Sequence, residues 1–118
     1  AAHPAFLGVE LLNEPAWAVE WDHGALLDYY TRALQAVRAA SSDALVVFNV
    51  LFYSDFPDGF GDWWAGQLVG PNVALDLHLY DCFGNASQRS LAEHRAQARA
   101  WGERIGALQA QGHRVIVA

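Results

Sequence analysis

The stretch GVELLNEP, residues 8–15, sets the fold that we expect for this chain. It begins as an apolar run and stops abruptly at an amide, a carboxylate and a proline: Asn13, Glu14 and Pro15. A near-continuous apolar run is typical of a parallel strand that is covered on both faces. The pattern therefore predicts a strand over residues 6–12, with a carboxylic acid at its carboxyl end.

Three further apolar runs follow at similar intervals, over residues 45–50, 73–79 and 114–117. The sequence between the first two strands has apolar residues at helical spacing after Asp22, a plausible N-cap. Another helix is predicted after the third strand, starting at a Ser90–Glu93 capping box and ending before Gly112. Strict alternation of strands and helices predicts right-handed βαβ units, and hence an α/β fold with a parallel sheet.

Composition limits the functions that are open to the chain. Its 118 residues are the size of one domain, and a hydrophobic content of 53% is ample for a core. A net charge of −6 excludes nucleic acid as an expected partner, because phosphate binding depends on clustered cations. We expect no membrane span and no internal disulfide, since Cys82 is alone. Without a signal-peptide pattern or any methionine, we expect a processed or partial product.

Polar side chains follow each of the first three predicted strands. In parallel α/β folds, ligands bind at the carboxyl ends of the strands. The residues there are Asn13, Glu14, Asn49, His78 and Tyr80. Desolvation beside an apolar sheet would raise the pKa of Glu14 and let it donate a proton to a leaving group. Glycoside hydrolysis with retention needs such an acid and a second carboxylate about 5–5.5 Å away, which no strand end provides.

Aromatic side chains are frequent in the predicted loops, where they could supply flat faces for sugar rings. Together with Asn49, the candidate substrate-binding residues are Trp17, Phe52, Trp63 and Phe83. Residues 62–68, which contain Trp63, could form a short helix.

Plainer roles remain open for several of these residues. Glu14 could be a helix-start carboxylate, His78 a core histidine and Asn49 a loop residue, and Glu10 is favoured as a structural residue within its strand. The acidic residues of the loop after residue 50 do not have the spacing of an EF-hand, and no residues show zinc-site spacing. We assign no metal and no cofactor.

Two segments carry a resemblance to a known family. GVELLNEP resembles the Asn-Glu-Pro signature at the fourth strand of the glycoside hydrolase family 5 (cellulase-like) (β/α)8 barrels. VALDLHLYDCF, residues 73–83, resembles the sixth-strand segment of the exo-1,3-β-glucanase branch, where a phenylalanine follows His-x-Tyr three residues on. The helix over residues 26–42 is similar to the same branch. The resemblance covers essentially the whole chain, from the fourth to the seventh strand.

The resemblance implies that residues 1–118 are the central to C-terminal part of an incomplete TIM-barrel catalytic domain. It makes Glu14 the general acid/base, Asn13 the neighbour that binds the sugar, and His78 and Tyr80 the pair that lines the catalytic centre. The nucleophilic glutamate of the family would follow just beyond Ala118. The implied activity is retaining hydrolysis of β-glucan, at β-1,3-glucosidic bonds, by a secreted or cell-surface enzyme.

Alternatives to catalysis by this chain are a non-catalytic carbohydrate-binding remnant and an inert barrel fragment. We expect the isolated 118 residues to be inactive, because one carboxylate cannot perform both halves of a double displacement. Four strands of an eight-stranded barrel leave two open edges, so the rest of the barrel should be needed for stability.

Overall fold

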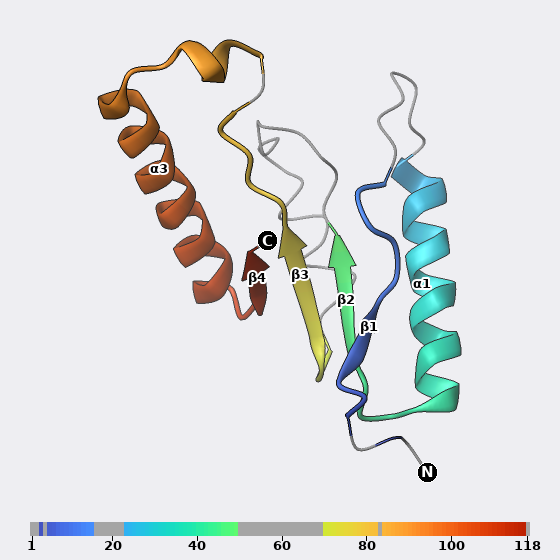
Figure 1. Cartoon of the computed structure of the whole chain (residues 1–118). Coiled ribbons are helices and arrows are strands. Elements are labelled where there is room, and N and C mark those ends of the chain that lie inside the picture. Colours follow the sequence, from blue (N-terminus) through green and yellow to red (C-terminus); the bar gives the residue numbers. More distant parts are fainter. Residues whose placement is uncertain (1–2, 4, 16–22, 50–69, 83, 118) are drawn as a thin grey trace.

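The computed structural model describes residues 3, 5–15, 23–49, 70–82 and 84–117 (Figure 1). Four strands, two α-helices and one short 3-10 helix follow one another among them. In chain order they are β1 (Gly8–Glu10), α1 (His23–Ala40), β2 (Leu45–Asn49), β3 (Val73–Leu77), η1 (Gly84–Gln88), α3 (Leu91–Ala110) and β4 (Val115–Val117). None of the described helices is long and apolar enough to cross a membrane.

The four strands form one parallel sheet in the order β1-β2-β3-β4. Each strand therefore pairs with the strand that precedes it in the sequence, and all four carboxyl ends lie at the same edge. The predicted α/β class and the parallel sheet are confirmed. Gly8 is opposite Leu45, and a Cβ atom at Gly8 would lie 2.1 Å from the Leu45 carbonyl oxygen. Only glycine allows this close approach of β1 to β2.

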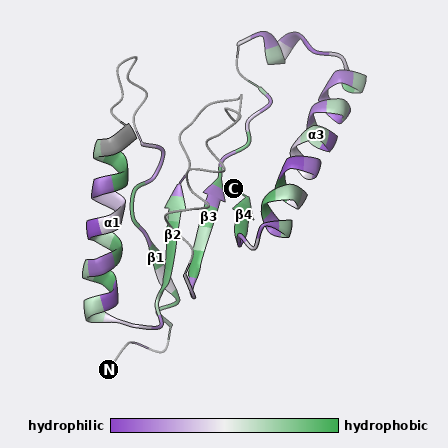
Figure 2. Ribbon diagram, turned by 180° about the vertical axis from the view of Figure 1, so that it is seen from behind, coloured by the Kyte–Doolittle hydropathy of each residue, from purple (hydrophilic) through white to green (hydrophobic). Residues whose placement is uncertain are grey.

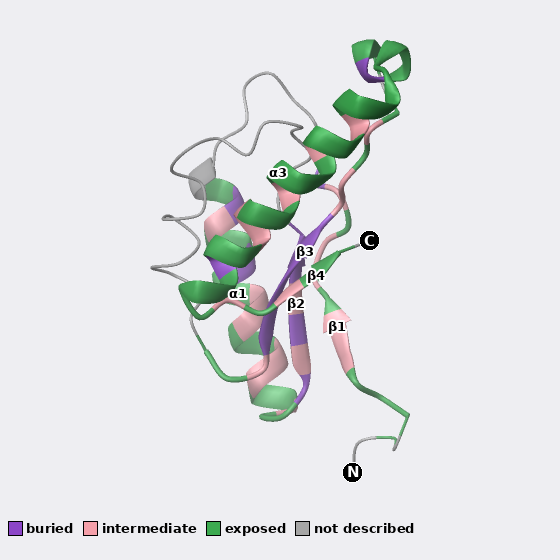
Figure 3. Ribbon diagram, turned by 90° about the vertical axis from the view of Figure 1, so that its left-hand side faces the viewer, coloured by how far each residue is buried: buried purple, intermediate pink, exposed green. Residues whose placement is uncertain are grey.

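Both α-helices lie on the same side of the sheet (Figures 1 and 3). The ring of Tyr30 on α1 meets the ring of Phe48 on β2 edge-on, with centroids 5.0 Å apart. Val46 and Phe48 face α1, whereas Leu108 reaches the core from α3. The buried apolar cluster consists of Leu26, Tyr30, Val46, Phe48, Val73, Leu75, Leu77 and Leu108.

The opposite face of the sheet carries polar groups. Side chains alternate along a strand, so Asn49 on β2 and Asp76 on β3 face away from Phe48 and Leu75. The two are register partners, which places them side by side. No described helix packs on this face. The apolar run at residues 6–12 predicted a sheet that is covered on both faces. Among the described residues, helices cover one face.

Strand β1 is shorter than predicted, and Phe6 and Leu7 are exposed before it. β3 also ends at Leu77, two residues before the predicted end. α3 has the predicted capping box at Ser90 and Glu93, and Gly112 follows its end with a positive φ of 94°. The helix packs beside the edge strand β4, and its C-terminal part contributes to the core. Hydrophilic and hydrophobic residues are mixed along the rest of the helix (Figure 2). The short helix predicted at residues 62–68 lies outside the described residues.

Candidate functional site

Three of the predicted catalytic side chains meet at the carboxyl edge of the sheet. The Nδ1 atom of His78 lies 2.7 Å from Oε1 of Glu14. The Tyr80 hydroxyl donates a hydrogen bond of 2.9 Å to the same oxygen. Between described residues, both of these hydrogen bonds go to Oε1, so Oε2 is the oxygen on which Glu14 could exchange a proton.

The backbone after β1 is held in a strained turn that directs Glu14 to this place. Glu14 has a φ of 41°, which is unusual for a residue with a side chain and more so before a proline. Leu11 anchors the turn, because its amide donates to Val47 and its carbonyl accepts from the Tyr29 hydroxyl at 2.8 Å. Strained residues of this kind gather at functional sites.

His78 and Tyr80 follow β3 two positions apart and point to the same side. Their ring centroids lie 6.1 Å apart, with the planes nearly perpendicular at 84°. A spacing of two residues along an extended chain gives two side chains this shared direction. His78 is largely buried and Tyr80 is exposed.

The electrostatics of Glu14 differ from the expectation that desolvation would raise its pKa. The hydrogen bonds from His78 and from Tyr80 lower the pKa of Glu14, and they outweigh the opposing effect of burial. The side chain is 36% exposed, which is too open for desolvation to dominate. With the described neighbours alone, Glu14 is therefore held as a carboxylate.

The pKa values of the two donors shift upward. Burial would lower the pKa of His78, but its hydrogen bonds to Glu14 and Asp76 raise it above the ordinary value. The hydrogen bond to Glu14 also raises the pKa of Tyr80. Each shift favours the protonated donor beside the charged carboxylate.

Asp76 is a part of the site that the sequence analysis did not single out. Its Oδ2 atom lies 3.0 Å from Nε2 of His78, and the residue is 7% exposed. The signal that could have found it is its position two residues before His78, on the same face of β3. The other carboxylate oxygen, Oδ1, is buried without a hydrogen-bond partner at strict geometry among the described residues.

Glu10 faces this buried carboxylate from β1. Desolvation raises the pKa of Glu10, and so do the charge of Asp76 and a hydrogen bond between the two carboxyl groups. The side-chain amide of Asn49 acts in the opposite direction and lowers the pKa of Glu10. Its Nδ2 and Oδ1 atoms are buried and have no partner within hydrogen-bonding geometry among the described residues.

A metal ion could in principle use one ligand atom each from Glu10, Asp76 and His78, which lie within 4.8 Å of one another. Both ring nitrogens of His78 are already directed at carboxylates, so a cation would have to displace Asp76 from Nε2. We assign no metal here.

The remaining predicted site residues are less closely connected to Glu14. Asn13 precedes Glu14 and is exposed, whereas Asn49 is fully buried at the end of β2. Its backbone carbonyl accepts a hydrogen bond of 3.0 Å from the buried Tyr30 hydroxyl. The predicted aromatic residues Trp17, Phe52, Trp63 and Phe83 lie outside the described residues.

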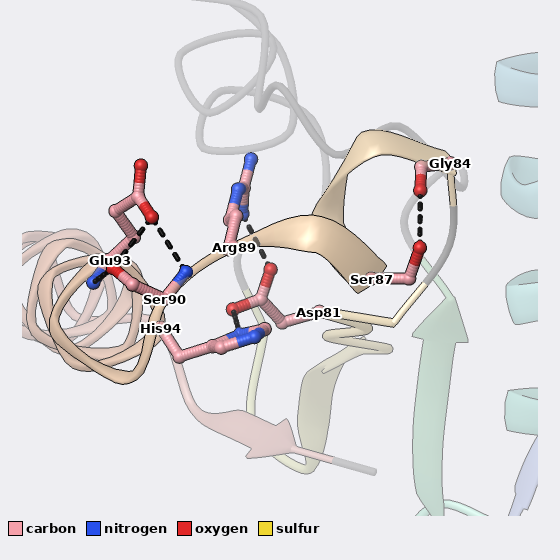
Figure 4. Close-up of polar contacts among 7 residues, drawn as sticks. All are labelled: Asp81, Gly84, Ser87, Arg89, Ser90, Glu93 and His94. Atoms are coloured by element: carbon pink, nitrogen blue, oxygen red, sulfur yellow. Dashed lines mark hydrogen bonds and ion pairs between the residues drawn. The ribbon is translucent and has the colours of Figure 1, made fainter.

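A second polar cluster fixes the chain just after Tyr80 (Figure 4). Asp81 is bound by Arg89 at 2.5 Å through one oxygen and by His94 at 2.5 Å through the other. The hydrogen bond from His94 is the main reason why the pKa of Asp81 is lowered. Because His94 belongs to the first turn of α3, the cluster ties the segment that carries Tyr80 to this helix.

The chain is similar over part of its length to enzymes of known name. It is 34% identical over 101 residues to "Glucan 1,3-beta-glucosidase 2" of Wickerhamomyces anomalus, covering 81% of this chain and 22% of that protein. It is 33% identical over 89 residues to "Probable glucan 1,3-beta-glucosidase A" of Emericella nidulans, covering 73% and 20%. The protein of the same name from Aspergillus clavatus is 33% identical over 79 residues, covering 65% and 17%.

The chain thus spans about a fifth of the length of the curated relatives that it matches. No protein-family model matches the sequence, and no solved structure matches it.

Proposed function

We propose that this chain is a segment of a retaining glycoside hydrolase of family 5 (cellulase-like) that acts on β-glucan, with Glu14 as the general acid/base. The observation that carries the proposal is the convergence of His78 and Tyr80 on one carboxylate oxygen of Glu14 at the carboxyl edge of a parallel sheet. The relatives named glucan 1,3-beta-glucosidase support a β-1,3-linked substrate.

The arrangement of the sheet supports a TIM barrel as the complete fold. Doubly wound sheets place helices on both faces and reverse the strand order, whereas a barrel keeps sequential order with helices outside. Here the order is β1-β2-β3-β4, and both helices lie on one side. In this proposal the strands are the fourth to the seventh of eight, residues 1–118 belong to one catalytic domain, and the polar face lines the interior.

Catalysis would proceed in two steps that use Glu14 in both protonation states. In the first, Glu14 donates a proton from Oε2 to the departing sugar oxygen while a second carboxylate attacks the anomeric carbon. In the second, the Glu14 carboxylate removes a proton from the water that releases the sugar. His78 and Tyr80 keep Oε1 occupied and so direct the exchange to Oε2.

The lowered pKa of Glu14 has a direct consequence for this mechanism. An acid that must be protonated at the start needs a nearby negative charge that opposes the two donors. The nucleophilic carboxylate proposed just beyond Ala118 would supply that charge from about 5–5.5 Å. In this proposal Glu14 is ionised without that charge, and the nucleophile raises its pKa in the complete site.

Substrate contacts are proposed for the residues around this carboxyl group. Asn13 is exposed beside Glu14 and can bind a sugar hydroxyl. Trp17, Phe52, Trp63 and Phe83 are proposed as stacking surfaces, and Asn49 remains a predicted contact although it is buried behind the rim. A secreted or cell-surface location is proposed with the family.

The test replaces Glu14 by Gln in the full-length protein and compares two β-glucosides. Turnover of a substrate with a poor leaving group should fall by roughly 10²–10⁴, whereas an activated aryl glucoside, which needs no proton, should lose far less in its first step. Glu103→Gln makes the same change at an exposed position of α3 and should have no effect. Equal turnover of the Glu14→Gln variant and the wild type would refute the assignment. Glucan binding by the wild type without any hydrolysis would favour a non-catalytic carbohydrate-binding protein.

A further inference from the structure

The starting observation is that His78 faces a carboxylate on each side of its ring. Nδ1 lies 2.7 Å from Oε1 of Glu14, and Nε2 lies 3.0 Å from Oδ2 of Asp76. A neutral imidazole carries one N–H, so it could donate to only one of these two groups. Both contacts are hydrogen bonds from the ring only if both nitrogens carry protons.

Burial makes the contact with Asp76 the more constraining of the two. The Asp76 side chain is 9% exposed, whereas the Glu14 side chain is 36% exposed, and the His78 side chain is 12% exposed. A buried carboxylate is costly unless it is paired, and Oδ2 of Asp76 has its partner in His78. The strand β3 thus presents a fixed acceptor to the inner nitrogen of the ring, which sets the direction of the outer nitrogen.

Glu10 is a second carboxyl group close to Asp76. Two close carboxyl groups cannot both ionise easily, and here the shift falls on Glu10, whose pKa desolvation and Asp76 together raise. A proton on Glu10 would also give the buried Oδ1 of Asp76 the donor that it lacks among the described residues.

We propose that Asp76 is a positioning residue for Glu14: it accepts the Nε2 proton of His78 and so holds the ring doubly protonated, with its Nδ1–H directed at Glu14. The proposal rests on the function proposed above for Glu14, and it adds a residue that acts through His78 without touching the substrate. In the part of the chain that the structure describes, the groups that face His78 are Glu10 and Glu14 from the β1 side, and Asp76 and Tyr80 from its own segment.

The experiment follows the His78 ring by NMR in the full-length protein with 15N-labelled histidine. The signal is assigned from its loss in a His78→Gln variant. In the wild type, both ring nitrogens should be protonated at pH 6.5, and the titration midpoint should lie above that of an ordinary histidine, about 6.5. Asp76→Asn keeps the shape and an acceptor oxygen but removes the charge, and it should lower the midpoint by about one pH unit.

Kinetics provide a second readout that a merely structural role would not move. Asp76→Asn should lower kcat by roughly 10- to 100-fold with little change in KM. The alkaline limb of the kcat/KM profile should move to higher pH, because a less charged His78 lowers the pKa of Glu14 less. Asp28→Asn is the matched control, because Asp28 is exposed on α1 and, among the described residues, its ion pair is the i,i+4 contact with Arg32. It should leave both readouts unchanged.

Two results would overturn the proposal. One is an unchanged His78 midpoint in folded Asp76→Asn protein. The other, which needs no variant of Asp76, is a wild-type ring whose Nε2 carries no proton at pH 6.5. Failure of the hydrolase assignment is a separate result, since it appears as full turnover of the Glu14→Gln variant whatever the His78 ring does.

Discussion

Glu14 and His78 are 64 positions apart in the sequence, yet their side chains are in contact at 2.7 Å. Their strands, β1 and β3, are not neighbours, because β2 lies between them. Strands in a sheet are about 4.8 Å apart, so the contact bridges roughly 10 Å between strand axes. It is possible because both residues lie beyond the ends of their strands. The contact therefore connects three strands at the edge where the site forms.

This pair should give the protein a pH window of maximum stability. The pKa of Glu14 is lowered, so its contribution is present above the unfolded value of about 4.3 and is lost as the pH falls through the folded value. The pKa of His78 is raised, so its contribution is present below about 6.5 and is lost as the pH rises through the folded value. Both contributions are present between about pH 4.5 and 6.5.

Urea unfolding of the protein at several pH values would measure this window. The free energy of unfolding should decline on both sides of it. In a His78→Gln variant the decline on the alkaline side should become smaller, because the titrating ring is gone. An alkaline decline of the same size in the variant would show that other groups cause it.

Replacing Tyr80 by Phe should raise the pKa of Glu14. The hydroxyl is one of two donors that stabilise the carboxylate, and its removal leaves His78 alone on Oε1. Under the proposed function, the alkaline limb of the kcat/KM profile should then move to higher pH. Ser87→Ala is the control, because that exposed hydroxyl donates to the carbonyl of Gly84 and not to Glu14 or its turn. A shift of the same size in both variants would contradict a direct effect.

Much of the fold could be predicted because its elements have a strong local pattern. The helix of residues 91–110 is predicted by its capping box and by the glycine that follows it, Gly112, which has a φ of 94° in the structure. Strand β2 is predicted by its β-branched residues. Strand ends were less predictable. β1 is only three residues long, since the turn to Glu14 begins soon after Glu10.

The site divides in the same way between local and non-local information. Strand ends indicated Glu14, His78 and Tyr80, and the structure brings these three together. The spacing of two residues places Asp76 on the same face of β3 as His78, but its burial and its pairing opposite Asn49 depend on strand register, which the sequence does not show. The direction of the Glu14 pKa was predicted wrongly, because the prediction considered desolvation and not the two donors.

Tyr30→Phe should destabilise the protein through the end of β2. The Tyr30 hydroxyl is buried and donates to the backbone carbonyl of Asn49, so its loss removes a donor from a buried acceptor. Such a loss costs about 1–3 kcal/mol of the free energy of unfolding. Urea unfolding of Tyr30→Phe and of Tyr29→Phe, whose hydroxyl is exposed, compares a buried with an accessible donor. A smaller loss for Tyr30→Phe than for Tyr29→Phe would argue against this account.

Gly8→Ala should separate β1 from β2 and thereby disturb Glu14. The new methyl group would lie 2.1 Å from the Leu45 carbonyl oxygen and 2.6 Å from the Leu45 Cβ, so the strands must move apart. We expect a loss of at least about 1–3 kcal/mol in the free energy of unfolding, as for overpacked sites. Gly102→Ala is the matched control, because no described residue lies within 4 Å of its added methyl group in α3. That change should stabilise the helix by about 0.5–1 kcal/mol. Because β1 leads directly to Glu14, the Gly8→Ala variant should also shift the titration midpoint of His78. A normal midpoint in a destabilised variant would show that the turn at Glu14 is held independently of β1.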